Sequence, residues 1–293
     1  MFVPCGVIAG SIGDLLDHFP ENIHSAFSVR RFNSFTGFAF RIRRNSDDEE
    51  ADLHFDDLGE ISLESLVNNF SSSSYASNLG EFMASSGYSD SDSLGEPDNA
   101  LIASWSDQSG NGRSISQAEA GKQPTLVLDG VIETENGRKA LDFYGDRLKI
   151  TDSNSYSQPN TYLCVAQSDA TSGNDYMTDG DGSGGRQLVV HTGGKKSHWA
   201  ATFASSSESS DTDQHLWFSV FDGSDSVLGI DGAANVLTSS PGTQSQSGFT
   251  VGARCSASNY WDGRIQEIIY YTGDHEATRA GMEYDVNRYF NIY

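Results

Sequence analysis

Apolar and polar residues alternate along many short stretches of the chain, as they do in half-buried β-strands. One clear example is Phe38, Phe40 and Ile42, which are separated by small or basic residues. Many short strands at close spacing are typical of an antiparallel β-sandwich or jelly roll. After residue 150 the predicted strands cover residues 161–167, 187–191, 198–204, 215–221, 227–230, 249–253 and 264–271.

Asp-Gly pairs between apolar runs mark β-hairpin turns. One pair follows the run that ends at Phe221, and a second follows the run that ends at Ile230. These turns support an all-β fold for the second half of the chain.

Two stretches have helical spacing instead. Residues 62–70 begin with Ser62 as a cap and carry apolar residues at i, i+3, i+4 and i+7, which predicts a short helix. The end of the chain predicts a longer helix with Asp274 as its N-cap. We expect this C-terminal helix to dock its aromatic end on the sandwich.

The chain is expected to form one jelly-roll domain over residues 26–293, preceded by an N-terminal arm or docking segment over residues 1–25. Residues 71–98 are rich in Ser, Gly and Asp and predict a surface excursion from the domain. Apolar residues of the arm are the candidates for docking onto a larger assembly, and they are Phe2, Val3, Ile8, Leu15 and Leu16.

The chain is strongly acidic, with 41 acidic and 18 basic residues and a net charge of −23. Nucleic acid is therefore not an expected partner, because phosphate binding needs a basic surface. Five of the basic residues fall between Arg30 and Arg44. We expect them to pair with acidic neighbours such as those at 47–50, and a site for an anionic ligand is the alternative.

No apolar run is long enough to cross a bilayer, so membrane insertion is not expected. The start of the chain lacks the basic segment of a secretory signal. If the protein works outside a cell, we expect another route, such as assembly into a virus particle. Cys5, Cys164 and Cys255 are too far apart for a metal motif, and a bridge between the last two is left open.

One polar turn stands out, with the sequence Trp-Ser-Asp-Gln-Ser-Gly-Asn-Gly-Arg at residues 105–113. Gly110 and Gly112 permit positive φ, and Asp107 and Asn111 can bond to nearby backbone. Such a turn could fix how two sheets are laid on each other, or it could line a ligand site.

Residues 100–293 resemble the concanavalin A-like lectin/glucanase superfamily. The resemblance rests on Trp-x-Asp-Gln-Ser-Gly-Asn-Gly, Gln-Pro-Thr-Leu, Ala-Leu-Asp-Phe-x-Gly, Trp-Phe-Ser-Val-Phe-Asp-Gly-Ser, and Asp-Gly-Arg-Ile-Gln-Glu-Ile-Ile-Tyr before a terminal helix. It is strongest to the laminin-G-like jelly rolls of bacteriophage and bacterial surface proteins. It implies a fold and leaves the function open, because this fold serves binders, enzymes and structural modules.

Residues 26–55 are similar to the opening of the catalytic domain of fungal-type α-L-arabinofuranosidases, where an analogous strand precedes the same Asp-Gln-Ser-Gly turn. The resemblance implies that residues 26–55 belong to the same sandwich. That family carries adjacent cysteines, a Tyr-Gly-Asn and a nucleophilic Glu. This chain has no Cys-Cys pair and no equivalent Glu motif, so the resemblance carries the fold and not the activity.

Sugars bind to aromatic faces with polar neighbours, and core packing is the alternative for each aromatic residue. Trp199 and the pair Tyr260 and Trp261 follow polar turns and are the aromatic candidates. The polar candidates for carbohydrate binding come from the turn at 105–113, and they are Asp107, Asn111 and Arg113.

Catalytic patterns are not found in the sequence. No strand carries the paired carboxylates of a glycosidase, no Gly-x-Ser-x-Gly is present, and Glu267 is interpreted as a surface or sheet-edge acid. The run from Asp179 to Gly185 places oxygen ligands at alternate positions, so Asp179 and Asp181 are metal candidates with calcium as the candidate cofactor. A Val at the twelfth position excludes an EF-hand loop, and a Gly/Asp hairpin is the alternative.

The first functional hypothesis is a non-enzymatic virion or surface module, such as a bacteriophage decoration, tail or fibre-associated protein. It would be located on the phage particle or outside the cell, with adhesion to host glycan as its candidate activity. Its predicted partners are copies of itself and a larger assembly. The alternatives are a glycan-cleaving enzyme related to arabinofuranosidases and an architectural protein without a ligand.

Overall fold

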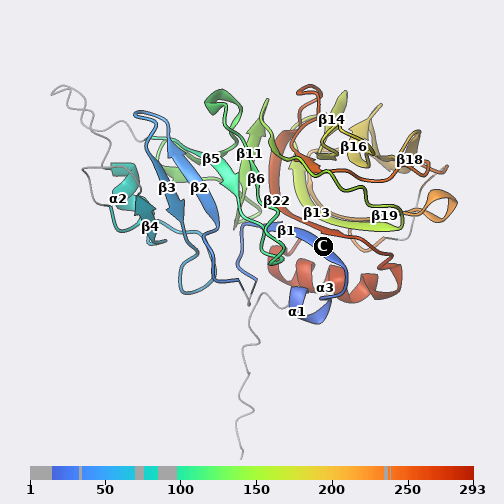
Figure 1. Ribbon diagram of the computed structural model, residues 1–293, viewed down its shortest axis with the longest axis horizontal. Coiled ribbons are helices and arrows are strands. Elements are labelled where there is room, and N and C mark those ends of the chain that lie inside the picture. Colours follow the sequence, from blue (N-terminus) through green and yellow to red (C-terminus); the bar gives the residue numbers. More distant parts are fainter. Residues whose placement is uncertain (1–14, 33–34, 70–75, 85–97, 234–236, 238) are drawn as a thin grey trace, which may run out of the picture.

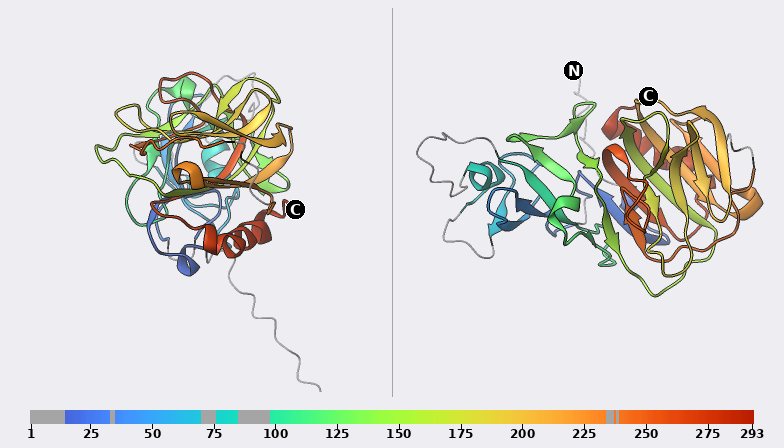
Figure 2. Two further views of the ribbon diagram at one scale, coloured as in Figure 1. Left: turned by 90° about the vertical axis from the view of Figure 1, so that its right-hand side faces the viewer. Right: turned by 90° about the horizontal axis from the view of Figure 1, so that it is seen from above.

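The computed structural model describes residues 15–32, 35–69, 76–84, 98–233, 237 and 239–293. The molecule is elongated, with the strands of residues 40–69 at one end and the strands of residues 188–230 at the other (Figure 1; Figure 2). Antiparallel strands dominate, and one helix of twelve residues lies near the C-terminus. The predicted all-β sandwich with a C-terminal helix is confirmed. The predicted N-cap Asp274 is wrong, because a 3-10 turn at Glu276–Thr278 comes first and the α-helix begins at Arg279.

The centre of the sandwich is an antiparallel sheet around the ten-residue strand β22 (Asp262–Tyr271). β22 pairs along one side with β13, and along the other side with β1 and β11. Almost every residue of β13 and β22 is buried, because the sheet is covered on both faces. The partners are β1 (Ile23–Ser28), β11 (Leu141–Tyr144), β13 (Asn160–Ser168), β19 (Gln214–Phe221) and β20 (Val227–Ile230).

A second layer lies over this sheet and is connected to it through β7 and β11. Aromatic rings fill the space between the layers: Tyr162 stacks on Tyr270 with centroids 4.6 Å apart, and Phe249 stacks on both. The strands of this layer are β2 (Phe40–Arg44), β3 (Glu50–Leu53), β4 (Val67–Asn69), β5 (Ala100–Trp105), β6 (Ile115–Ser116), β7 (Thr125–Leu128), β8 (Val131–Ile132), β12 (Leu148–Ile150), β15 (Thr178–Asp179) and β21 (Phe249–Val251).

A smaller antiparallel sheet lies on the same side as this second layer, at the right of Figure 1. Its strands are β14 (Asn174–Tyr176), β16 (Leu188–Thr192), β17 (Lys195–Trp199) and β18 (Phe203–Ser209). The last three follow one another through short connections, whereas β15 and the loop at 180–187 lie between β14 and β16. A separate two-stranded ribbon consists of β9 (Thr134–Glu135) and β10 (Arg138–Lys139).

Helices cover the opposite face of the central sheet (Figure 1). α3 (Arg279–Phe290) packs on β19, and the short α1 (Leu15–His18) packs on α3. Another short helix, α2 (Leu79–Ala84), lies near β4 at the other end of the molecule. Within the described residues, no helix has the length and apolar character needed to cross a bilayer.

The polar turn at residues 105–113 holds β1 in the central sheet. Asp107 accepts hydrogen bonds from the backbone N–H groups of Ala26 and Arg113, each at 2.9 Å. The amide of Gln108 accepts from the Phe32 N–H at 3.0 Å and donates to the carbonyls of Ser28 and Arg30. Buried backbone groups need such partners, so this turn supplies the edge of β1 with hydrogen bonds that no strand provides.

A buried ion pair lies where β1 leaves the sheet. The guanidinium of Arg30 donates from Nε and Nη2 to the two carboxylate oxygens of Glu267, at 2.7 and 2.9 Å. Arg30 is 2% exposed and Glu267 is 1% exposed. The rings of Tyr289 and Phe290 in α3 lie 4.8 and 5.5 Å from the guanidinium carbon. Glu267 is therefore an internal residue, and its interpretation as a surface or edge acid was wrong.

The strand predictions agree well with the structure, except at 198–204, which spans the turn between β17 and β18. The predicted helix at 62–70 is wrong in its described part, because Val67 begins β4 and pairs with Leu53 of β3. Pairing with β3 determines the structure of this segment in spite of its helical spacing of apolar residues. Leu63 and Leu66 remain exposed. The basic residues at 41–44 do pair with nearby acids, as in the contacts of Arg44 with Asp47.

The N-terminal arm differs from its prediction where it is described. Leu15 and Leu16 are buried in α1, so they pack within the chain and are not free to dock elsewhere. β1 begins at Ile23, inside the range predicted for the arm. Phe2, Val3 and Ile8 lie outside the described residues, as does most of the excursion at 71–98. Cys164 and Cys255 are free thiols, so the bridge that the sequence left open is not formed, and Cys164 is buried.

Removing the carboxylate charge of Glu267 is expected to destabilise the fold strongly. E267Q leaves the Arg30 guanidinium buried without a counter-charge, so we expect the free energy of unfolding to fall by about 3–5 kcal/mol. Urea denaturation measures this change. The double variant R30M/E267L removes both charges and should recover most of the loss. As a control, E276Q at an exposed position should change stability by less than about 0.5 kcal/mol; an equally small effect of E267Q would contradict the prediction.

Candidate functional site

Two loops meet beside the small sheet and bring several predicted site residues together. The first loop follows β15 and covers residues 180–187, and the second follows β21 and covers residues 252–261. β14 holds the second loop in place, because the Tyr176 N–H donates to the Asn259 carbonyl at 3.2 Å. We call this region the Trp199 surface, and it consists of Tyr176, Asp179, Arg186, Trp199, Cys255 and Tyr260.

An ion pair between Asp179 and Arg186 organises the first loop. The guanidinium donates from Nε and Nη2 to the two Asp179 oxygens, at 2.8 and 2.6 Å. The backbone N–H groups of Gly180 and Cys255 also donate to Asp179, at 2.7 and 2.8 Å. Asp179 is fully buried, and Arg186 reaches partly into solvent. The carboxylate therefore ties both loops together.

Trp199 is the last residue of β17 and lies directly beside this ion pair. Its ring centroid is 5.1 Å from the guanidinium carbon of Arg186, a cation–π distance. The indole packs on a small apolar cluster of Tyr176, Leu188 and Val190, and part of it stays exposed. A partly exposed indole beside a charged hydrogen-bond donor has the chemical character of a sugar-stacking position.

Tyr260 lies on the other side of Tyr176. Its backbone forms a parallel bridge with Tyr176, and its hydroxyl donates to the Ala257 carbonyl at 3.0 Å. The Lys122 ammonium lies 4.9 Å from the centroid of the Tyr260 ring. The surface therefore carries a second partly exposed aromatic ring next to a cation.

Asp146 lies next to the Trp199 surface, and its carboxyl group is less acidic than usual. Burial raises the pKa of Asp146 to about 6, although the Tyr144 N–H and the Lys122 ammonium act in the opposite direction. Its neighbour Arg147 donates to the Cys255 carbonyl at 3.1 Å, which links this segment to the second loop. A carboxyl group with this pKa is partly protonated near neutral pH and can give up a proton. Burial and the Asp179 carboxylate raise the pKa of the Cys255 thiol, so Cys255 is not activated as a nucleophile.

Other predicted residues lie away from the Trp199 surface or have a different role. Trp261 is 1% exposed, and its indole N–H donates to the Gln167 carbonyl, so it packs in the core and offers no free face. Asp107 and Asn111 bond to the backbone of β1. Arg113 donates to the Tyr156 hydroxyl at 3.0 Å. Three of the six carbohydrate candidates are therefore part of the turn that secures β1.

The metal candidates also have other partners. Arg186 places a positive charge on Asp179 where a cation would bind, and Asp181 accepts hydrogen bonds from Ser183 and from the Asp152 N–H. Within the described part of the chain, no group of three or more His, Cys, Asp or Glu side chains is arranged to hold a metal ion. Calcium at this loop stays a prediction of the sequence.

The sequence analysis missed Arg186, Tyr176 and Lys122. Arg186 carries the clearest signal, since it ends the Gly/Asp/Ser run at 179–185 and is the only basic residue near it. The other two have no local signal, because their role depends on contacts with residues far along the chain.

Comparisons with known proteins agree with this fold. No family model matches the chain, and no curated protein is significantly similar to it in sequence. A solved GH54 α-L-arabinofuranosidase soaked with a cyclic sulfate inhibitor has a TM-score of 0.59 at 12% identity, covering 94% of this chain and 64% of that one. The chain therefore has a β-sandwich fold similar to that of this enzyme. A second arabinofuranosidase, complexed with arabinofuranosyl-α-1,2-xylobiose, has a TM-score of 0.58 at 14% identity and the same coverage.

The chain spans 64% of the length of these enzymes, and at such low identity the similarity concerns the fold alone. It agrees with the arabinofuranosidase resemblance of residues 26–55. The concanavalin A-like resemblance, the virion or extracellular location, self-association and docking onto a larger assembly find no support in these similarities and stay predictions.

The raised pKa of Asp146 predicts a pH-dependent stability. The group has an ordinary pKa of 3.8 and a folded pKa of about 6, so the folded protein binds its proton more tightly than the unfolded chain does. The free energy of unfolding should therefore fall as pH rises from about 4 to about 7, by as much as about 3 kcal/mol from this group.

D146N should remove this part of the pH dependence. Asn is neutral at every pH and keeps an oxygen for the Tyr144 N–H, so the variant should match the wild type near pH 4 and be more stable near pH 7. Urea denaturation of both proteins at several pH values tests this. Asp175, whose pKa burial also raises to about 6, contributes equally to both proteins. A constant difference between them across this range would contradict the assignment.

Proposed function

We propose that this protein is a carbohydrate-binding β-sandwich and that the Trp199 surface is its binding site. The observation that carries the proposal is the partly exposed Trp199 indole beside the Arg186–Asp179 ion pair. Indole faces attract the C–H faces of sugars, and a guanidinium donates hydrogen bonds to sugar oxygens. The arabinofuranosidase-type fold supports the choice of ligand class.

The ligand to test first comes from the structural neighbours. One of them is complexed with arabinofuranosyl-α-1,2-xylobiose, which is an arabinose branch on a short xylose chain. Two partly exposed aromatic residues, Trp199 and Tyr260, are separated on this surface by Tyr176. This arrangement suits a ligand of more than one sugar unit, so arabinoxylan oligosaccharides are the appropriate probes.

Binding without cleavage is the better supported activity. A retaining glycosidase needs two carboxyl groups about 5–5.5 Å apart, one of them free to attack the sugar. Asp179 is the one carboxylate among the six residues of the Trp199 surface, and both its oxygens are held by Arg186 and two backbone N–H groups. It is poorly placed to act as a nucleophile.

Replacing Trp199 should weaken binding without unfolding the protein. We expect W199A to raise the Kd for an arabinoxylan oligosaccharide by about tenfold or more, because buried aromatic anchors dominate such interfaces. Isothermal titration calorimetry measures the change, and thermal denaturation checks the fold. The control is Y284A, which removes an exposed aromatic ring of α3. Equal affinities of W199A, Y284A and the wild type would refute the proposed site.

Glycoside hydrolysis is the second candidate function, and Asp146 is the observation in its favour. A glycosidase acid needs a raised pKa to stay protonated near neutral pH, and Asp146 has one. The same samples can be analysed for released arabinose. Release that is absent from D146N would favour the enzyme, whereas binding with no release would favour the binding module.

A further inference from the structure

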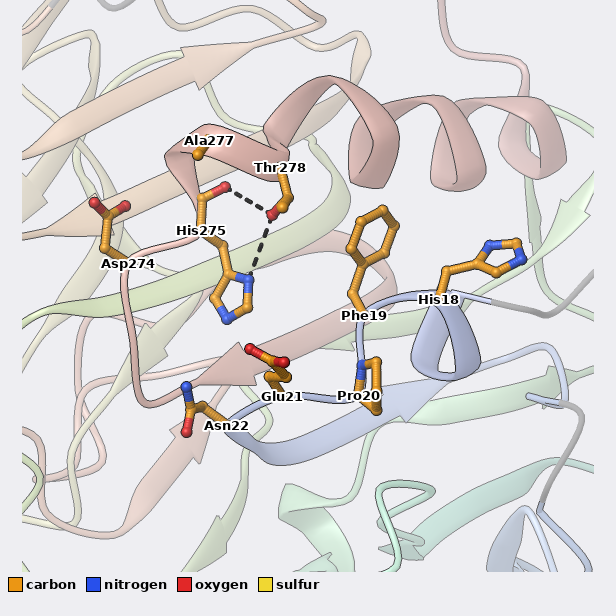
Figure 3. Close-up of a pocket in the computed structure, with 9 residues that line it drawn as sticks. All are labelled: His18, Phe19, Pro20, Glu21, Asn22, Asp274, His275, Ala277 and Thr278. Carbon is orange, nitrogen blue, oxygen red and sulfur yellow. Dashed lines mark hydrogen bonds between the residues drawn. The ribbon is translucent and has the colours of Figure 1, made fainter.

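A pocket of about 380 Å³ lies beside α1 and the start of α3, and Figure 3 shows its lining residues. It forms between the segment that leads from α1 into β1 and the segment that leads from β22 into α3. The two segments are joined by the backbone, because the Thr272 N–H donates to the Asn22 carbonyl at 2.8 Å. We call it the His275 pocket, and its lining is His18, Phe19, Pro20, Glu21, Asn22, Asp274, His275, Ala277 and Thr278.

His275 is the most unusual side chain of this lining. It is only 9% exposed, and its ring packs on Tyr271 with centroids 4.5 Å apart. The Nε2 atom is buried and has no hydrogen-bond partner among the described residues. Figure 3 shows this nitrogen directed toward the Glu21 side of the pocket. A buried polar atom without a partner is costly, so a ligand that satisfies it is favoured.

The surroundings of His275 indicate which kind of ligand group can form a hydrogen bond with Nε2. The Thr278 hydroxyl lies 3.4 Å from Nδ1 and donates to the His275 carbonyl at 3.1 Å. A neutral imidazole has one donor and one acceptor nitrogen, and a hydroxyl group can pair with either. Burial lowers the pKa of His275, whereas the Asp274 carboxylate and the backbone and carboxylate of Glu21 raise it. A ligand hydroxyl, which can donate or accept, therefore suits Nε2 whichever ring nitrogen carries the proton.

The rest of the pocket narrows the class of ligand. The carboxylates of Glu21 and Asp274 are hydrogen-bond acceptors, and their negative charge disfavours an anionic ligand. Phe19 and Pro20 supply an apolar wall, and Phe19 rests on Gly281 of α3, where an added Cβ would lie 2.9 Å from the ring. An apolar wall opposite several acceptors fits the C–H face and the hydroxyl groups of one sugar ring.

We propose that the His275 pocket binds a neutral polyhydroxylated ligand of about one sugar unit, with a ligand hydroxyl hydrogen-bonded to His275 Nε2 and the sugar ring lying against Phe19. The pocket volume falls in the usual range for small-molecule sites. This site shares no residue with the Trp199 surface, so it does not depend on the proposed function.

The test is saturation-transfer difference NMR with the full chain and a panel of arabinose, xylose, xylobiose and galactose, with butylamine as a cationic probe. We expect saturable binding of at least one sugar. H275A should weaken it about tenfold, the effect of losing one buried hydrogen bond. E276Q, which changes an exposed residue next to the pocket, is the matched control and should bind as the wild type does.

Further variants keep the test decisive. If H275A does not fold by circular dichroism, E21Q takes its place, since Glu21 is exposed and its loss of charge leaves the core unchanged. W199A separates the two sites, because sugar bound in the His275 pocket should survive this change. The proposal is overturned if no sugar binds saturably, if H275A and E21Q both bind like the wild type, or if butylamine binds while the sugars do not.

Discussion

The side chains of Asp107 and Gln108 bind the backbone of residues 26–32, and the fold depends on this contact. Among the described residues β1 pairs with β22 on one side only, so its other edge would otherwise leave backbone groups buried without partners. Two side chains from a tight turn take the place of a neighbouring strand. Trp105 adds to the same contact, because its indole N–H donates to the Ser28 carbonyl.

The buried pair of Arg30 and Glu267 lies directly beyond this turn and depends on it. Arg30 follows β1, and Gln108 holds its carbonyl while its guanidinium reaches the Glu267 carboxylate between the sheet and α3. A charge at that depth is tolerable only with a partner in good geometry. The turn, the ion pair and the end of α3 thus form one connected unit. The polar turn at residues 105–113 therefore has a structural role that accounts for its polar residues without a ligand.

The two proposed ligand sites lie outside this unit, and their residues come from segments that the fold brings together. The Trp199 surface combines the ends of β15 and β17 with the loop after β21, and the His275 pocket combines the entry to β1 with the exit from β22. In the first site Trp199 is partly exposed beside a cation, and in the second site His275 Nε2 has no hydrogen-bond partner in the part of the chain that the structure describes. Loops on a rigid sandwich are where such groups can persist.

The sequence by itself determined the all-β class, most strands after residue 160, the C-terminal helix and the pairing of the basic residues near 44 with their acidic neighbours. These features follow from period-two alternation, turn residues and short separations, which are local properties. The tertiary structure alone decided that residues 67–69 form a strand, that Glu267 and Leu15 are internal, and that Trp199 rather than Trp261 keeps an exposed part. The partner of Asp179 and the pocket around His275 belong to the same group. Burial and pairing depend on residues far apart in the chain, and no local pattern specifies those contacts.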